Sequence, residues 1–430
     1  MKEQKISLST AILLNMNIMI GSGILIGPGV SAAISGNASF LAWPLVALMF
    51  LPIVLCTIEL SRMFPGAGGF YLYAKQGLNK TAGFASGWLY IVAYTFAATV
   101  EILALHKTLV TSFGPNFITN NVFLFNILAL SAILAFSLLS LKVVGRFLNS
   151  LTIVKILPTI ILIALLPFII DTSFTISTGE LALLPASLAL PIFGYFGFEY
   201  CVGVSHLIKD SEKNAPRAIL IGFLGTGFLY MLFHFGLLNL MGKENLATYG
   251  ATSFADFITL PIPYLKSLLK ILIPAASLLI FVASLIGMLN TNAILLQTMA
   301  REGLFKRGAL LTQETSLGRP WFTLLLQGII VFLLASFIPS IPLIGGLTNL
   351  GFFLSFILPC ISLLIVQKRR NLYSKMPISI LGLLLVLGFC IYSWLILSAS
   401  MNERFLYTAI LAVVFGIGML LFNNDKKDQH

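Results

Sequence analysis

"NIMIGSGILIGPG", residues 17–29, lies inside an apolar stretch that is long enough to cross a lipid bilayer. Four glycines and one proline fall between Gly21 and Gly29. Each glycine costs a helix interior up to about 1 kcal/mol relative to alanine, and a proline costs more. The stretch therefore predicts either glycines that allow close helix packing or a deliberate break in a membrane-spanning helix.

The composition is that of an integral membrane protein. Hydrophobic residues make up 58% of the chain and charged residues only 10%, whereas soluble domains carry about 25% charged residues. A membrane-spanning helix needs roughly 20 apolar residues. Because helices satisfy their backbone polar groups internally, we expect an all-α protein. The predicted spans, about twelve, lie near residues 8–34, 40–61, 82–105, 121–141, 148–170, 183–205, 216–241, 264–297, 320–338, 343–366, 377–399 and 404–422.

The positive charge is distributed unevenly along the chain. If the N-terminus is cytoplasmic, 20 of the 26 lysine and arginine residues fall on cytoplasmic segments between the predicted spans. This asymmetry follows the positive-inside rule and predicts a cell-membrane protein with both termini in the cytoplasm. The net charge of +11 therefore sets the orientation in membrane lipid, and nucleic-acid binding is not expected.

The cysteines and histidines point to no chemistry of their own. The sequence has four of each, and their spacing matches neither a disulfide framework nor a metal site. The sequence also lacks the common motifs that pair a nucleophile with a base. We therefore expect no metal, no cofactor and no enzymatic activity.

A second interrupted span supports the idea of a deliberate break. The stretch LPIFGYFGFEYCVGVS, residues 190–205, places Pro191, Gly194 and Gly197 inside the sixth predicted span. Transporters built from inverted repeats carry interrupted helices at matching positions in their two halves, and these two interruptions are one five-helix repeat apart. We therefore interpret both stretches as broken helices.

Four stretches, in order, resemble motifs of the amino acid–polyamine–organocation (APC) superfamily of permeases. They are IGSGILIGPG (20–29), IELSRMFPGAGGFYLYAKQGL (58–78), FGFEYCVGVSHLIKDSEKNAPRAI (196–219) and MLNTNAILLQTMAREGLFKR (288–307). The resemblance covers essentially the whole chain. It implies one transporter domain, 1–430, with the LeuT-type fold: five helices (8–170), an inverted set of five (183–366) and two more (377–422). It also implies transport of amino acids or related amines.

The broken helices predict where a substrate binds. Unwinding near Ser22 and Gly23 frees backbone N–H groups at the start of the outer half-helix, which attracts anions such as a substrate carboxylate. Gly21 and Gly23 let the backbone approach that ligand. Carbonyl groups freed around residues 192–194 are expected to accept hydrogen bonds from the substrate ammonium. The expected substrate-binding residues are Ile20, Gly21, Ser22, Gly23, Ile24, Ile192, Phe193, Gly194, Phe196, Tyr94, Ala98 and Glu101.

Lys155 is the lysine that falls well inside a predicted span. A lysine at the centre of a membrane helix costs roughly 2.5–3.5 kcal/mol on insertion scales. In proton-coupled members of the resembled family, a lysine of this span occupies the place of sodium between the first and eighth helices. The resemblance thus implies a proton-coupling role, and burial, which disfavours the charged form of lysine, suits proton loading and release. The alternative is a static ammonium that tethers two helices.

Two further side chains near the second break each have two interpretations. Glu199 matches a glutamate of the family's sixth helix, and it either relays protons or anchors the break through hydrogen bonds. Phe193 lies where similar proteins carry an aromatic that closes over the substrate, and the alternative is an aromatic that packs in the core or against lipid. Buried glutamates are expensive and usually satisfied by partners, so both interpretations of Glu199 stay open.

Glu101 has no counterpart among the motifs of the resembled family. It shares a helical face with Ala98 and Tyr94, at spacings of three and seven residues. Because the third span lines the substrate pocket in the implied fold, Glu101 is a candidate contact for a cationic part of the substrate. Pairing with His106 or Lys107 near the outer end of the span is the alternative.

Together these features predict a secondary active transporter of amino acids that works by alternating access and proton symport through Lys155. Its partners are then a small-molecule substrate, protons and membrane lipid. Within the same family, the alternative is an exchanger of an amino acid for its product, in which Lys155 only stabilises a gate. A substrate sensor without transport is a further alternative, while a channel would need polar rings along several spans.

Overall fold

The computed structural model describes residues 5–64, 66, 68–203, 208–396 and 401–423, and the structural statements below refer to these residues. Every regular element among them is a helix, and two isolated β-bridges are the only strand-like pairings there. The all-α fold class predicted from the sequence is therefore confirmed. The last residues of the predicted spans near 205 and 399, and both chain termini, lie outside the described residues.

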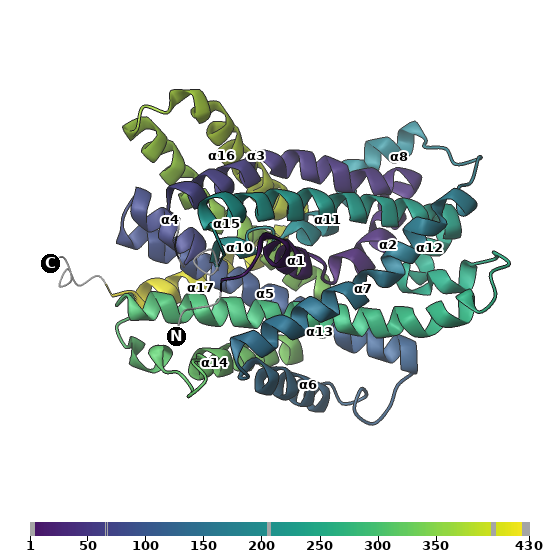
Figure 1. Ribbon diagram of the computed structural model, residues 1–430, viewed down its shortest axis with the longest axis horizontal. Coiled ribbons are helices and arrows are strands. Elements are labelled where there is room, and N and C mark those ends of the chain that lie inside the picture. Colours follow the sequence, from purple (N-terminus) through teal and green to yellow (C-terminus); the bar gives the residue numbers. More distant parts are fainter. Residues whose placement is uncertain (1–4, 65, 67, 204–207, 397–400, 424–430) are drawn as a thin grey trace.

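The helices pack together in one bundle (Figure 1). Their bounds are α1 Leu8–Met19, α2 Gly23–Ser35, η1 Gly36–Leu41, α3 Ala42–Met63, α4 Gly69–Gly77, α5 Lys80–Phe113, α6 Val122–Ser137, α7 Leu141–Ile169, α8 Thr178–Leu183, η2 Leu184–Ser187, α9 Ala189–Tyr195, α10 Tyr200–Gly203, α11 Ser211–Met241, α12 Lys243–Tyr249, η4 Ala251–Phe257, α13 Leu265–Arg301, η5 Gly308–Thr312, α14 Trp321–Phe337, α15 Ile341–Arg369, η6 Tyr373–Lys375, α16 Met376–Ile396 and α17 Met401–Leu421.

The structure does not confirm the predicted count of twelve membrane spans. Among the described residues, eight helices are long and apolar enough to cross a membrane, or nine if the bent pair of residues 178–187 and 189–202 forms one span. Helices α1, α6 and α14 are apolar but have only 12, 16 and 17 residues. The first predicted span is divided by a break after Met19, and its outer part continues through η1 into α3.

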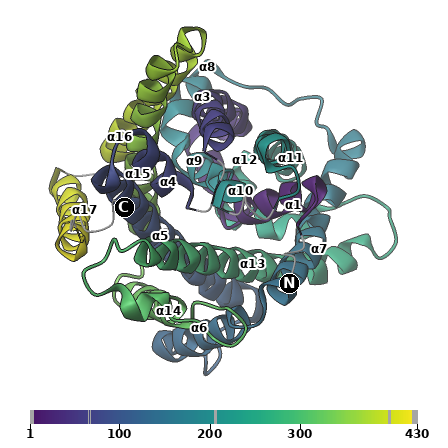
Figure 2. The ribbon, with the colours of Figure 1, turned by 60° about the vertical axis from the view of Figure 1, so that its left-hand side comes forward.

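The interrupted helices lie in the middle of the bundle. Figure 2 shows α1, α9 and α10 surrounded by longer helices, with α6, α14, α16 and α17 towards the outside. In the long helix α5, 89% of the most apolar window is buried, whereas the corresponding values for α16 and α17 are 28% and 17%. Helix α5 thus lies at the centre of the bundle, whereas α16 and α17 lie towards its outside and are mostly exposed.

The two ends of the bundle are distinguished by their short helices. Figure 1 shows α4 at one end and α8 and α12 at the other. We call these the α4 end and the α8 end. At the α8 end, the carboxylate of Glu180 accepts hydrogen bonds from the backbone N–H of Asn37 and from Nζ of Lys243, both at 3.0 Å. These contacts tie α8 to η1 and α12, so the chain segments around the outer part of the first span are held together.

Close packing around α9 depends on glycine. A Cβ atom at Gly23 of α2 would lie 2.9 Å from the Cα atom of Gly194 of α9, and a Cβ atom at Gly194 would lie 2.9 Å from the Trp43 ring. Both distances are shorter than side chains tolerate. The absence of side chains therefore lets α2, α9 and α3 approach one another, as packing glycines do in membrane bundles.

Replacing Gly194 with alanine is expected to destabilise the bundle. The new methyl group would meet Trp43, whose ring packs on Tyr230 with centroids 4.6 Å apart. Overpacking of this kind costs about 1–3 kcal/mol, which thermal unfolding of the purified protein in detergent measures. Gly225→Ala on α11 is the matched control, because nothing lies within 4 Å of its Cβ position. Equal loss of stability in the two variants would contradict this packing role.

Candidate functional site

The chain of the first span is irregular between Met19, where α1 ends, and Gly23, where α2 begins. This is the place where the sequence predicts a break. The last carbonyl groups of α1 and the first N–H groups of α2 have no partners within their own helices. Side chains from other helices must therefore satisfy these groups in a region that water does not reach freely.

Lys155 of α7 satisfies the end of α1. Its Nζ donates hydrogen bonds to the carbonyl oxygens of Asn17 at 2.6 Å and Ile20 at 2.8 Å, and the side chain is only 1% exposed. The hydroxyl of Ser284 of α13 donates to the same Ile20 oxygen at 3.3 Å. An ammonium at the C-terminal end of a helix complements the negative end of its dipole. Lys155 thus lies at the break, beside a residue of the eighth predicted span.

Glu101 of α5 occupies the other side of the break. Its Oε1 accepts hydrogen bonds from the backbone N–H and from the hydroxyl of Ser22, both at 3.0 Å, and the residue is fully buried. A carboxylate at this position complements the positive end of the α2 dipole. The place where the sequence predicts a substrate carboxylate is therefore filled by a carboxylate of the protein itself.

The alternative that pairs Glu101 with His106 or Lys107 is wrong. His106 instead forms a hydrogen bond through Nε2 with the carbonyl oxygen of Thr119 at 2.8 Å, and Lys107 is exposed. The physical reason is the direction of the side chains on α5. Glu101 lies on the buried face that the sequence assigns to it, whereas the two basic residues follow a turn later, where the helix approaches the surface.

The glycines at the break have protein neighbours in place of open space. A Cβ atom at Gly21 would lie 2.6 Å from Oε1 of Glu101, and Gly23 packs on Gly194. That these two glycines let the backbone approach a ligand stays a prediction, and Gly21 lines the cavity described below. In this structure the two glycines let the backbone approach Glu101 and α9.

The second break falls at Gly197, the last of the three residues that the sequence places inside the sixth predicted span. Helix α9 continues through Pro191 and Gly194 and ends at Tyr195, and α10 begins at Tyr200. Gly197, with φ of +100°, makes the turn between them. A side chain at this residue would be strained by the backbone and would also lie 2.6 Å from Cγ2 of Ile18.

Glu199 anchors this second break through three hydrogen bonds. Its Oε1 accepts from the hydroxyl groups of Tyr90 at 3.0 Å and Tyr94 at 2.9 Å, and its Oε2 accepts from the backbone N–H of Gly197 at 3.1 Å. The residue is 2% exposed. The carboxylate therefore joins the segment between α9 and α10 to α5.

The carbonyl groups expected to face a substrate ammonium lie in the last turn of α9. The oxygen of Phe193 already accepts from the N–H of Phe196 at 3.2 Å. Those of Ile192 and Gly194 belong to the group of terminal carbonyls that a helix leaves without partners of its own. The end of α9 thus lies close to the start of α2, whereas a role of its carbonyls in binding an ammonium stays a prediction.

A small cavity lies between the two breaks, and we call it the central cavity. It lies against α1, the first break, α5, α9, α13 and α15. The residues that line it are Ile18, Met19, Gly21, Tyr94, Ala97, Glu101, Phe193, Phe196, Met288 and Phe352. Five of the predicted substrate-binding residues are among them. The other seven, Ile20, Ser22, Gly23, Ile24, Ile192, Gly194 and Ala98, are buried but do not line the cavity.

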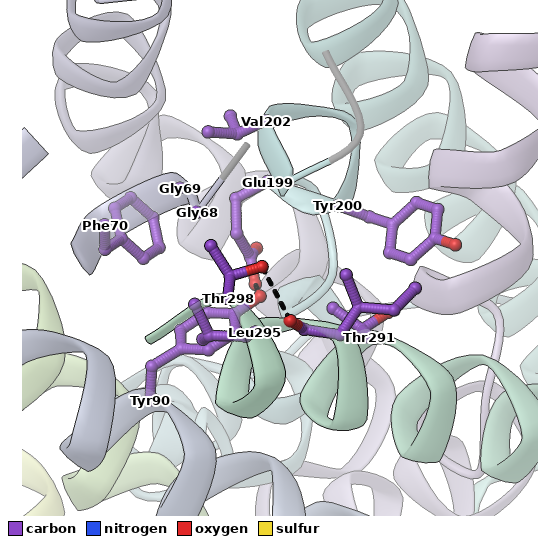
Figure 3. A pocket seen from close by; sticks show the side chains of 11 residues that line it. Gly68, Gly69, Phe70, Tyr90, Glu199, Tyr200, Val202, Thr291, Leu295 and Thr298 are labelled. Atoms are coloured by element: carbon purple, nitrogen blue, oxygen red, sulfur yellow. Dashed lines mark hydrogen bonds between the residues drawn. The ribbon is translucent and has the colours of Figure 1, made fainter. Parts of the chain in front are cut away.

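A larger cavity lies towards the α4 end, and we call it the α4-side cavity (Figure 3). Tyr90 and Glu199 line it, together with residues of α13 such as Thr291 and Thr298. In Figure 3 the Glu199 side chain points from the second break towards Tyr90. Because Tyr94 lines the central cavity and bonds to Glu199, the hydrogen-bonded group of Tyr90, Tyr94 and Glu199 separates the two cavities.

Sequence reasoning missed several wall residues of the two cavities. Tyr90 lies one helical turn before Tyr94, so helical spacing on the third span gave a usable signal for it. Met288 and Phe352 come from distant helices, and no local pattern marks them among the 12 methionines and 35 phenylalanines of the chain. In the described part of the chain, no three His, Cys, Asp or Glu side chains are grouped as a metal ion requires.

Comparison with known proteins gives a consistent result across the chain. The family model described as "Amino acid permease" matches residues 6–416. The serine/threonine exchanger SteT of Bacillus subtilis is 28% identical over 59% of this chain, and the low-affinity putrescine importer PlaP of Escherichia coli is 28% identical over 44%. These matches span 59% and 43% of the two relatives' own lengths. The branched-chain amino acid permease BcaP of Bacillus subtilis is 22% identical over 83% of this chain.

Removing the two tyrosine hydroxyls is expected to weaken the barrier between the cavities. Each of Tyr90→Phe and Tyr94→Phe deletes one hydrogen bond to Glu199, and bonds to charged groups contribute about 1.5–3 kcal/mol. A cysteine introduced at Ala97, in a background without the four native cysteines, then reacts with a water-soluble maleimide about tenfold faster or more. Tyr249→Phe at an exposed site of α12 is the control. An unchanged labelling rate in the variant that carries both substitutions would contradict the role of these hydrogen bonds as a barrier.

Proposed function

The chain belongs to the amino acid permease family, and from this premise we propose that it is a secondary transporter of amino acids or related amines. In this proposal it works in the cell membrane by alternating access, with both termini in the cytoplasm. The observation that carries the proposal is the meeting of two broken helices at one central cavity, with a buried lysine holding one of the breaks. The domain then consists of two inverted five-helix repeats, 8–170 and 183–366, followed by two helices over 377–422.

The central cavity is the proposed substrate site. Secondary transporters bind substrate near the bilayer midplane, at discontinuous helices whose ends supply partners for charged groups. Phe193 and Phe196 at the second break provide apolar walls of this cavity. In this proposal the ring of Phe193, which is 7% exposed, closes the cavity over the substrate.

Alternating access requires one barrier on each side of this cavity. Towards the α4 end, the proposed barrier is the group of Tyr90, Tyr94 and Glu199, beyond which the α4-side cavity begins. Towards the α8 end, α2 is closed against η2 through bonds from Ser31 and Ser35 to Ser187, at 3.2 and 3.0 Å. Opening one barrier while the other stays closed moves the substrate across the membrane.

Lys155 is the proposed site of proton coupling. Its ammonium holds the end of α1 through the Asn17 and Ile20 carbonyls. Hydrogen bonds from a charged donor are roughly twice as strong as those from a neutral one. Loss of the proton therefore loosens α1 from α7, which links the protonation of Lys155 to the position of α1. One proton crossing 100 mV supplies about 2.3 kcal/mol, enough for a substrate gradient of about fifty-fold.

An obligatory exchanger is the second candidate. One relative is described as a serine/threonine exchanger, and the bonds of Lys155 to α1 equally suit a permanent tether. In an exchanger, the binding site changes from facing one side of the membrane to facing the other only when a solute is bound. The proton gradient then supplies no driving force. The two candidates share the site and differ in what Lys155 does.

Uptake into proteoliposomes separates the two candidates. We expect an imposed inward proton gradient to drive accumulation of at least one labelled amino acid or amine. We also expect Lys155→Ala to lose this dependence because the residue then carries no proton. Lys107→Ala, at an exposed position of α5, is the matched control and keeps the dependence. Uptake that needs internal substrate and ignores the gradient would establish an exchanger and leave Lys155 as a tether.

Glu199 is proposed to anchor the second break in its ionised form, because three donors converge on its carboxylate. Glu199→Gln is then expected to lower the maximal uptake rate, since the amide matches these donors poorly, without changing the shape of the pH profile. Initial uptake rates measured across a pH series test this. A flattened pH profile would instead assign Glu199 to the proton pathway.

A further inference from the structure

One oxygen atom of Glu101 has no partner in the structure. Oε1 is bonded to Ser22, whereas Oε2 is buried and forms no hydrogen bond with any of the described residues. Leaving a buried acceptor unsatisfied costs about 1–3 kcal/mol, and more for a charged group. Such an atom in a folded protein needs an explanation, and a missing ligand is one.

The surroundings of this oxygen indicate which ligand fits. Glu101 belongs to the central cavity, and among the described residues that line it, Glu101 is the one charged side chain. The hydroxyl of Tyr94 is already used as a donor to Glu199. Phe196 and Phe352 stack at 4.1 Å and form an aromatic wall of the same cavity. Aromatic faces attract cations, so the free carboxylate oxygen and the aromatic rings both favour a positively charged ligand.

The carboxylate of Glu101 also disfavours a second anion. It takes the N–H of Ser22 at the start of α2, which is the position that a substrate carboxylate needs. A substrate carboxylate there would lie beside the carboxylate of Glu101, and like charges at close range in a low-dielectric site repel strongly. An amino acid in its ordinary zwitterionic form therefore gains one favourable contact, between its ammonium and Glu101, and one unfavourable contact, between its carboxylate and Glu101.

The charge balance at the two breaks leads to the same conclusion. The buried ionisable groups that satisfy the breaks are two carboxylates, Glu101 and Glu199, and one ammonium, Lys155. With all three groups ionised, they sum to one negative charge. Buried charges are stable when they are paired. A ligand with a single positive charge therefore neutralises the summed charge of the two breaks, whereas a zwitterion leaves that sum unchanged.

We propose that the central cavity selects a primary monoamine without a carboxylate, the decarboxylated counterpart of an apolar amino acid, whose ammonium binds Oε2 of Glu101. This inference rests on the proposed function, since it takes the central cavity as the transport site. The ammonium donates to the unpaired oxygen, and the apolar body lies against Phe193, Phe196 and Phe352. Glu101 thereby determines specificity as a direct contact.

Two matched pairs of probes test the proposal. Isoamylamine and leucine differ only by the carboxylate, as do phenethylamine and phenylalanine, and leucinamide supplies a cation close to leucine in size. We expect each amine to bind the purified protein about tenfold more tightly or better than its amino acid, measured as Kd by calorimetry. Leucinamide is expected to follow the amines, because charge rather than size decides.

The variant Glu101→Gln is expected to bring the ratio of the two Kd values close to one. Glu59→Gln is the matched control, because Glu59 bonds to Lys375 at the α4 end, away from the cavity, and keeps the wild-type ratio. The wild-type ratio tests the proposal even if Glu101→Gln does not fold. Tighter binding of the amino acids to the wild-type protein overturns the inference and leaves the proposed function standing. Absence of binding by every probe and of uptake of any labelled amino acid or amine overturns both.

Discussion

The break in the first span is held by two buried charges of opposite sign. The ammonium of Lys155 lies at the carbonyl end of α1, and the carboxylate of Glu101 lies at the N–H end of α2. Each charge complements the helix dipole at its position. Within a membrane, unpaired backbone groups cost several kcal/mol each, so the break is stabilised by these side chains of α5 and α7, together with the hydroxyls of Ser284 and Tyr230.

The second break is also held by hydrogen bonds to a buried charged side chain. Glu199 accepts from two tyrosine hydroxyls of α5 and from Gly197. Helix α5 thereby supplies partners to both breaks, which explains why it is the most deeply buried of the long helices. Between the breaks, glycines at positions 23 and 194 let α2 and α9 approach closely. The central cavity is the space left by two interrupted helices that share one supporting helix.

The charges buried at the two breaks cost free energy to desolvate. Buried ion pairs contribute little to stability on balance, because desolvation offsets the attraction. In our proposals, Lys155 and Glu101 therefore serve movement and binding in addition to holding the first break. Lys155 bonds to backbone atoms of a helix end, so its protonation changes the strength of a contact between helices. Glu101 keeps one oxygen free beside the cavity, which makes it the natural partner of a cation.

Local sequence determined much of this protein, since some features need no knowledge of neighbours. Apolar stretches predicted the membrane helices, clustered glycine and proline predicted both breaks, and the buried lysine drew attention to Lys155, because each carries an energetic cost in a membrane helix. Tertiary structure alone decided that Glu101 fills the expected carboxylate position, that Gly23 meets Gly194, and that Met288 and Phe352 reach the cavity. These contacts depend on the relative orientation of helices that are far apart in the chain. Helical periodicity predicts which face of a helix is buried, but it does not predict which residues that face contacts.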